Sequence, residues 1–317
     1  MWRFNDHGAP MRVLILGAGA VGGYFGGRLL EAGGDATFFV RRARAQLLAS
    51  RGLRIDSPAG NLVTAVKTIS DPEALAPFDL VLLTCKAYDL DASLNDIAGA
   101  VGPTTTILPL LNGLAHIERI AARFPQARLW GGVARISAAL ADDGAIRHAD
   151  DFARIDFGAR DGCADTLADQ LAALYAKTSV IAVHNPNILR EMWDKLVFLA
   201  TLAAMNTLMR STIADIMVTP AGGRLIREML SECASVARAE GFEFDAARVA
   251  QHGDSLALRA ANMKSSMLYD IERGAPTEGE HILGDLHARA RRHGVNAPLL
   301  EIALTHVQAY EARRARG

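Results

Sequence analysis

A lysine stands inside an otherwise apolar stretch of the sequence. Lys195 lies in "REMWDKLVFLATLAAMN" (190–206), where nearly every following side chain is hydrophobic. A cation held in a dry cleft stabilises an oxygen on which negative charge develops, and it can supply a proton to that oxygen. The alternative is an ordinary ion pair with Glu191, four residues earlier on the same helix face. The residue type and its setting alone leave both interpretations of Lys195 open.

A glycine-rich loop is the strongest motif of the sequence. It follows the apolar run "MRVLIL" (11–16) and precedes a helical pattern. The loop reads Gly17, Ala18, Gly19, Ala20, Val21, Gly22. In such a loop the first glycine permits the tight turn, the second lets the backbone approach a pyrophosphate, and the third lets helix and strand pack closely. Because strand, loop and helix occur in the required order, the motif predicts dinucleotide binding.

Two arginines stand where the second strand of the same unit should end. After "DATFFV" (35–40) come Arg41 and Arg42, at a position where enzymes that use NAD carry an acid for the ribose 2′-hydroxyl. A guanidinium suits a 2′-phosphate instead, so the sequence favours NADP. The alternative is that both arginines only solvate the start of a helix.

Two further strand ends carry polar side chains. Lys86 follows the apolar run 79–85, and Asn112 follows the run 105–111. Ligands of open parallel sheets bind beyond the carboxyl ends of the strands, so both residues are candidates for contacts with cofactor, and Asn112 also with substrate. Taken alone, Asn112-Gly113 has another explanation, because Asn-Gly favours a turn.

These residues need a doubly wound sheet to bring them together. Alternating strands and helices up to about residue 186 predict a parallel α/β sheet of the Rossmann type. Strands are expected at 11–16, 35–40, 79–85 and 105–111, helices at 20–33, 43–50, 89–100 and 114–123, and extending strands near 129–136, 145–148, 153–157 and 179–183. From 187 to 317 only helical patterns follow, at 187–209, 211–217, 220–240, 246–271, 277–294 and 297–314. We therefore expect a loose extension over 1–10, a dinucleotide-binding domain over 11–186 and an all-helical domain over 187–317.

Composition excludes several classes of function. The net charge of -1 provides no basic surface for nucleic acid, and the sequence has no apolar run long enough for a membrane span. Three dispersed cysteines form neither a CxxC pair nor a cluster with histidine, so we expect a reduced, cytoplasmic protein without a metal site. The C-terminal helices are apolar enough for a homodimer contact, although a monomer would show the same pattern.

Five segments together resemble the ketopantoate reductase (2-dehydropantoate 2-reductase) family. They are "GAGAVG", "TCKAYD", "LLNGL", "REMWDKL" and "SSMLYDIERGAPTEGEHILG", in this order over nearly the whole chain. The resemblance implies a Rossmann domain followed by a helical domain similar to that of 6-phosphogluconate dehydrogenase. It also implies reduction of a 2-keto acid by NADPH, with ketopantoate in pantothenate biosynthesis as the leading substrate.

The resemblance assigns roles to three residues of the second domain. Lys195 matches the family's catalytic lysine, and Glu278 matches its glutamate near cofactor and substrate. Ser266 matches the serine that binds the substrate carboxylate, although a small residue at a helix contact would look the same. From the residues themselves, Thr277 and Glu280 form a T-x-x-E capping box, which would commit Glu280 to the helix start and leave Glu278 available for the cleft.

The chain departs from the family pattern at two positions. Leu199 and Ala203 stand where members specific for ketopantoate carry asparagines, and Asn206 lies nearby at a different helical angle. A pocket without those amides would discriminate poorly for a substrate hydroxyl. The sequence thus keeps open a dehydrogenase of another keto acid or of an imine, and a dinucleotide-binding regulator without turnover. Lys195 and Glu278 argue against the regulator, which needs no proton donor.

Overall fold

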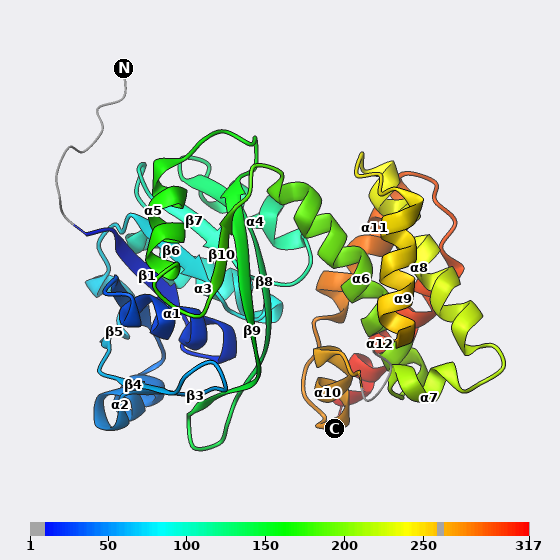
Figure 1. Ribbon diagram of the computed structural model, residues 1–317, viewed down its shortest axis with the longest axis horizontal. Coiled ribbons are helices and arrows are strands. Elements are labelled where there is room, and N and C mark those ends of the chain that lie inside the picture. Colours follow the sequence, from blue (N-terminus) through cyan, green and yellow to red (C-terminus); the bar gives the residue numbers. More distant parts are fainter. Residues whose placement is uncertain (1–9, 259–262, 317) are drawn as a thin grey trace. The chain divides into compact units, whose positions relative to one another are not determined.

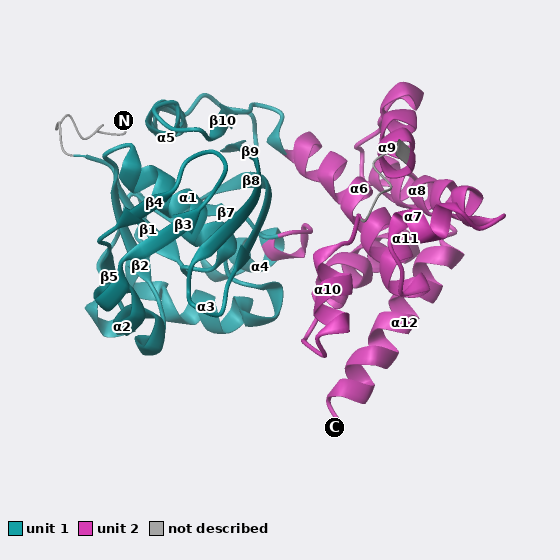
Figure 2. Ribbon diagram, turned by 60° about the horizontal axis from the view of Figure 1, so that its bottom comes forward, with its two compact units in different colours: residues 1–111, 117–188 teal, residues 112–116, 189–317 magenta. Residues whose placement is uncertain are grey.

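The computed structural model describes residues 10–258 and 263–316, which form two compact units. Unit 1 comprises residues 1–111 and 117–188, and unit 2 comprises residues 112–116 and 189–317 (Figure 2). The extension expected over residues 1–10 falls, apart from Pro10, outside the described residues. The short segment 112–116 is thus grouped with helices that follow it by more than 70 residues, and this segment carries Asn112.

Unit 1 is built on a parallel sheet with the strand order of a Rossmann fold. The order β5-β2-β1-β6-β7-β8 is parallel throughout, which corresponds to the doubly wound order 3-2-1-4-5-6. These strands are β1 (Arg12–Leu16), β2 (Asp35–Phe39), β5 (Lys67–Ile69), β6 (Leu80–Leu83), β7 (Thr106–Pro109) and β8 (Arg128–Leu140). Every residue of β6 and β7 is buried, as expected of strands covered on both faces. The predicted fold class is confirmed.

Helices and short helical turns connect these strands (Figure 1). They are α1 (Ala20–Glu31), α2 (Arg42–Arg51), η1 (Pro72–Ala74), η2 (Ala87–Asp89), α3 (Leu90–Asp96), η3 (Ala98–Ala100), α4 (Ala115–Arg123) and α5 (Thr166–Tyr175). The sequence did not predict α5, which packs with Tyr175 in the core, where its hydroxyl donates to the carbonyl oxygen of Phe25 at 3.1 Å. Helix α1 lies against β2, β3 and β8, so the helix that follows the glycine loop is held by the sheet itself.

An antiparallel ribbon extends the sheet beyond β8. β8 pairs with β9 (Ile146–Ala159), and β3 (Leu53–Asp56), β4 (Leu62–Thr64) and β10 (Ile181–His184) complete this side. The sequence predicted two short strands where the structure has the single strand β9, because exposed residues in its middle interrupt the apolar pattern. The register with β8 shifts at the same place, between Ile136 and Ala138. Strands β3, β4 and β5 were not predicted; three or four residues are too few to show a period.

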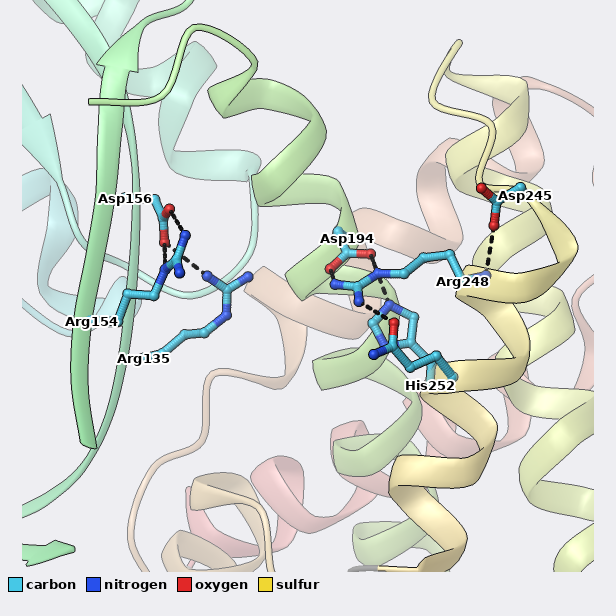
Figure 3. Close-up of polar contacts among 8 residues, drawn as sticks. Arg135, Arg154, Asp156, Asp194, Asp245, Arg248 and His252 are labelled. Carbon is cyan, nitrogen blue, oxygen red and sulfur yellow. Dashed lines mark hydrogen bonds and ion pairs between the residues drawn. The ribbon is translucent and has the colours of Figure 1, made fainter. Parts of the chain in front are cut away.

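A buried carboxylate holds the ribbon together. Arg135 of β8 and Arg154 of β9 stand directly opposite each other, and two like charges there would repel. Asp156, which is fully buried, accepts hydrogen bonds from both, at 3.0 Å from Arg135 Nη1 and 2.7 Å from Arg154 Nη2 (Figure 3). Asp156 thus offsets the repulsion between the two arginines, which lie next to the point where the register of β8 and β9 shifts.

The regular elements described for unit 2 are all helices. Its elements are α6 (Ile188–Met209), α7 (Ile213–Met217), α8 (Gly222–Ala239), α9 (Ala246–Leu258), α10 (Ser266–Glu272), the π-helix η4 (Glu280–Gly284), α11 (Asp285–Arg292) and α12 (Pro298–Arg314). Helix α8 packs against α9, α11 and α12, and it buries an apolar face that includes Met229, Cys233 and Val236. Of the described helices, none combines the length and hydrophobicity needed to cross a membrane.

One predicted helix of unit 2 is wrong. The sequence predicted a single helix over 246–271, but α10 begins anew after Ser265, whose backbone is extended (φ -73°, ψ 154°) and whose hydroxyl accepts from Leu268 N at 3.2 Å. A serine side chain that binds the backbone three residues later starts a helix, so it cannot be read as part of a continuous one. Residues 259–262 lie outside the described part of the chain.

Candidate functional site

The first and third glycines of the loop after β1 are required by the fold of unit 1. Gly17 has φ +94°, which strongly favours glycine, and its N–H donates to Phe39 O at 3.0 Å. A Cβ at Gly22 would lie 2.2 Å from Thr84 Oγ1 and 2.4 Å from Gly17 O. Thr84 itself donates to Leu16 O at 2.7 Å, so it has little freedom to move away. Both glycines therefore serve the contact between β1, α1 and β6.

The second glycine is not required by internal packing. A Cβ at Gly19 would meet no atom of the described protein within 4 Å, and the backbone there (φ -81°, ψ -162°) is open to any residue. Gly19 is the N-cap of α1, no side chain caps this helix, and its first turn contains no acid. The loop residues Ala18, Ala20 and Val21 leave the same edge of the helix accessible, since only Ala18 is fully buried. A helix N-terminus that no side chain caps fits a dinucleotide's phosphates.

Three arginines follow β2, and they differ in what they contact. Arg41, the N-cap of α2, has a side chain that is 89% exposed and lies 3.7 Å from Asp89. Arg42 opens α2 and is exposed as well. Arg44, which the sequence analysis missed, instead donates to Ala18 O and to Gly144 O, each at 2.9 Å. Burial lowers the pKa of Arg44.

Arg44 braces the glycine loop, while Arg41 and Arg42 remain candidates for the 2′-phosphate. The only sequence signal for Arg44 was its position three residues after Arg41, on the neighbouring turn of the same helix. Lys86 follows β6 and is the N-cap of η2. Since β2, β1 and β6 are adjacent parallel strands, the glycine loop, Arg41 and Lys86 all follow carboxyl ends at one edge of the sheet.

In unit 2, Lys195 is bonded to a residue 83 positions earlier in the sequence. The half-buried Lys195 on α6 donates from Nζ to Asn112 Oδ1 at 2.9 Å. This contact orients both groups, because the ammonium has further N–H donors and the amide keeps its own N–H groups for other contacts. Two residues singled out separately in the sequence are thus brought together by the fold.

The residue before Lys195 anchors this part of α6. Asp194 is only 4% exposed and accepts a bidentate interaction from Arg248 of α9, with Arg248 Nε 2.7 Å from Asp194 Oδ1 (Figure 3). His252 Nε2 lies 2.9 Å from the same Oδ1. Burial alone would raise the pKa of Asp194, but the hydrogen bonds and charges of His252 and Arg248 lower it well below its usual range. The sequence analysis did not identify this network, whose members are 54 and 58 residues apart.

The capping box predicted at Thr277 and Glu280 is wrong. Thr277 Oγ1 does accept from Gly279 N at 3.3 Å, but Thr277 N donates to Glu311 Oε1 of α12 at 2.6 Å. Glu280 accepts from Gln308 Nε2 at 2.7 Å instead. The T-x-x-E pattern was misleading because Glu311 of α12, and not Glu280, accepts the hydrogen bond from Thr277 N. Glu278, the candidate acid, is 6% exposed and lies at the start of this segment.

Ser266, which the resemblance assigns to the substrate carboxylate, and Asn206 differ in their exposure to solvent. Ser266 is exposed as the first residue of α10, whereas the neighbouring Ser265 is buried. Asn206 is fully buried, accepts from Ser265 N at 2.7 Å and donates to Ser211 O at 2.9 Å. Its amide therefore serves the helix junction. No group of three or more His, Cys, Asp or Glu side chains in the described residues is arranged to hold a metal ion.

Comparisons with known proteins agree with the fold and the motifs. The model "Ketopantoate reductase PanE/ApbA" matches residues 13–162, and its C-terminal counterpart matches residues 187–311. The chain belongs to the ketopantoate reductase family. This family consists of NADP-dependent oxidoreductases, so the chain is an enzyme of that class.

Individual ketopantoate reductase relatives span the whole chain. "Uncharacterized oxidoreductase YkpB" of Bacillus subtilis is 35% identical over 96% of this chain and 100% of its own length. The crystal structure of 2-dehydropantoate 2-reductase from Methylococcus capsulatus has a TM-score of 0.85 and 27% identity, over 97% of this chain and 99% of the other. A dimeric ketopantoate reductase from Staphylococcus aureus has a TM-score of 0.81 and 25% identity, over 96% and 100%.

Proposed function

We propose that this protein reduces a 2-keto acid to a 2-hydroxy acid with NADPH, and that 2-dehydropantoate (ketopantoate) is the leading substrate, in pantothenate biosynthesis. The single observation that carries the proposal is the hydrogen bond from Lys195 Nζ to Asn112 Oδ1. A lysine oriented in this way, in a family of reductases, has a defined task at a carbonyl group. Family membership and the glycine loop support the same reaction.

When bound, NADPH supplies the hydride that reaches the carbonyl carbon. Lys195 donates a hydrogen bond to the ketone oxygen and transfers a proton from Nζ to it as the alkoxide forms, and the resulting amine regains a proton from water. The cation stabilises the alkoxide more than the ketone, so its effect is greatest in the transition state. Asn112 holds the Lys195 side chain through its Oδ1. Glu278 and Ser266 are proposed for the substrate, Ser266 for its carboxylate.

The choice of NADPH rests on the residues after β2. Arg41 and Arg42 carry exposed guanidinium groups where an acid would be needed for an unmodified ribose. Gly19 and the N-terminus of α1 suit the pyrophosphate, and Lys86 and Asn112 are proposed for the remainder of the cofactor. We also propose a cytoplasmic location and, by analogy with the dimeric relative, a homodimer, which light scattering would test.

A second substrate class is favoured by the apolar face of α6. Leu199 is half-buried, Ala203 is buried, and Asn206 uses its donor and its acceptor within the helix junction. None of these three side chains offers an amide to a substrate hydroxyl. A site without such partners does not gain from that hydroxyl, so a 2-keto acid with an apolar side chain is the alternative to ketopantoate.

An assay of NADPH oxidation separates these possibilities. The purified enzyme is supplied with ketopantoate and with apolar 2-keto acids of matched size that lack the hydroxyl. A higher kcat/KM for ketopantoate supports the leading substrate, and a higher value for the apolar acids supports the alternative. Absence of turnover with every acid, despite tight binding of NADPH, would refute the proposed reaction and favour a non-catalytic NADPH-binding regulator.

A further inference from the structure

Two buried histidines of unit 2 contact each other although 165 residues separate them. His116 Nδ1 lies 3.3 Å from His281 Nε2, and the rings stack with centroids 5.5 Å apart and an interplanar angle of 21°. His116 is fully buried and His281 is 8% exposed. In such a pair one ring nitrogen donates and the other accepts, so the contact orients both rings and couples their tautomers.

The two histidines belong to the segments that carry candidate site residues. His116 follows Asn112 by four residues, and His281 follows Glu278 by three. Between them, Gly113 adopts φ +81°, and a Cβ there would lie 3.0 Å from His281 Cδ2 and 3.2 Å from His281 O. The turn that presents Asn112 therefore rests directly on His281.

The segment that carries His281 is itself held in place. It forms the π-helix η4, and single turns of this kind are frequent at functional sites. Helix α12 holds the N-terminal end of η4, through Glu311 to Thr277 N at 2.6 Å and through Gln308 to Glu280 at 2.7 Å. A rigid η4 gives His281 a fixed position from which to hold the Asn112 turn.

We propose that His116 and His281 are positioning residues for the reaction of Lys195. Their hydrogen bond holds the Asn112-Gly113 turn against η4, and this contact fixes the Asn112 oxygen that accepts from Lys195 Nζ. The inference rests on the proposed function for its effect on turnover. Its structural part, the dependence of the Asn112 side chain on the histidine pair, is tested separately.

The experiment compares five variants with the wild-type enzyme. His281→Phe and His116→Phe keep a flat ring but remove the hydrogen bond, and each leaves a buried imidazole nitrogen without this partner. The double variant His116→Phe/His281→Phe replaces both rings and removes that penalty. His281→Gln introduces a side-chain amide that can still form a hydrogen bond with His116, and it serves as the rescue variant. His306→Phe, a histidine on α12 outside the pair, is the matched control.

We expect each single Phe variant to lower kcat by about 10–100-fold, because a shift of about 1 Å at a reacting group costs that much. KM and the Kd of NADPH should rise by a smaller factor than kcat falls, since the histidines act on the ligands only through Asn112. His281→Gln should recover most of kcat. The double variant should recover Tm but not kcat, which separates positioning from stability.

A readout without turnover keeps the two proposals distinguishable. The side-chain amide signal of Asn112 in ¹⁵N NMR, assigned by its loss in Asn112→Asp, should move in His281→Phe and stay in place in His306→Phe. The inference would be overturned by a double variant with wild-type kcat, or by an Asn112 amide signal that does not move in His281→Phe. If the wild-type enzyme turns over no 2-keto acid while the Asn112 signal responds as expected, the proposed function fails and the positioning contact stands.

Discussion

The glycine loop of unit 1 and the lysine site of unit 2 are built in opposite ways. The loop occupies six consecutive residues, and its demands are local: a positive φ at Gly17 and a close contact at Gly22. The lysine site combines Asn112, Lys195 and the segment after Glu278, which lie in three distant parts of the sequence. A loop can be recognised from spacing, whereas an assembled site depends on contacts that spacing does not encode.

The two regions also differ in how charge is handled. In unit 1 the candidate phosphate-binding groups are backbone N–H groups and exposed arginines, which water screens. In unit 2 the residue beside Lys195 is a buried carboxylate held by Arg248 and His252. Changes in unit 2 should therefore cost more free energy than changes at the surface of unit 1, and the predictions below test this order.

The largest effect is expected at Lys195. Lys195→Met should lower kcat by about 10²–10⁴-fold, because a positioned proton donor contributes that much, while the Kd of NADPH stays within about twofold. Steady-state kinetics and cofactor titration measure the two quantities. Lys177→Met, at an exposed lysine of unit 1, is the control and should behave as wild type. Unchanged kcat in Lys195→Met would remove the assigned role.

The next effect is expected on stability at Asp194. Asp194→Ala should lower the free energy of unfolding by about 1.5–3 kcal/mol, because it leaves the buried His252 and the partly exposed Arg248 without their carboxylate. Urea denaturation measures this, and Asp254→Ala on the exposed face of α9 is the control. A loss no larger than that of the control would mean that the network contributes no net stability.

Asp194 also predicts a dependence of stability on pH. Its folded-state pKa is lowered, so its contribution is fully present above the unfolded value of about 3.9 and is lost as the pH falls below that value. In Asp194→Asn the free energy of unfolding should fall less steeply as the pH decreases below that value, because the variant has no carboxylate to protonate. Parallel slopes for wild type and variant below pH about 4 would contradict the assignment.

A smaller and more informative effect is expected from two glycines of one loop. Gly22→Ala should destabilise unit 1 by about 1–3 kcal/mol, because its Cβ overlaps Thr84 and the backbone of Gly17. Gly19→Ala meets no protein atom, so Tm should stay unchanged while NADPH affinity falls. Thermal unfolding and cofactor titration distinguish the two. Normal NADPH binding by Gly19→Ala would indicate that the pyrophosphate does not bind at Gly19.

The smallest effect is expected at Arg41. Arg41→Ala should weaken NADPH binding by about tenfold at low salt and leave NADH binding nearly unchanged, because only NADPH carries the 2′-phosphate. Arg51→Ala, at the other end of α2, is the control. Equal losses for both cofactors would count against the contact. Substitution of Arg44 should differ, weakening both cofactors through the loop it braces.

Much of unit 1 was predictable because its signals are short-range. Apolar runs of strand length located β1, β6 and β7, and their alternation with helices led to the correct fold class. The strands β3, β4 and β5 escaped because they are too short to show a period. The single helix predicted over 246–271 and the capping box at Thr277 failed because Ser265 and Glu311 formed bonds that the local pattern did not indicate.

The sequence by itself determined the family, the fold class and the candidate residues of the loop and of α6. These follow from backbone requirements and periodicity, which act over a few residues. Only the tertiary structure decided that Asn112 accepts a hydrogen bond from Lys195, that Asn206 binds the backbone at Ser265, and that His116 contacts His281. The reason is physical: a buried polar group must find a hydrogen-bond partner, and which partner it finds depends on packing between distant segments.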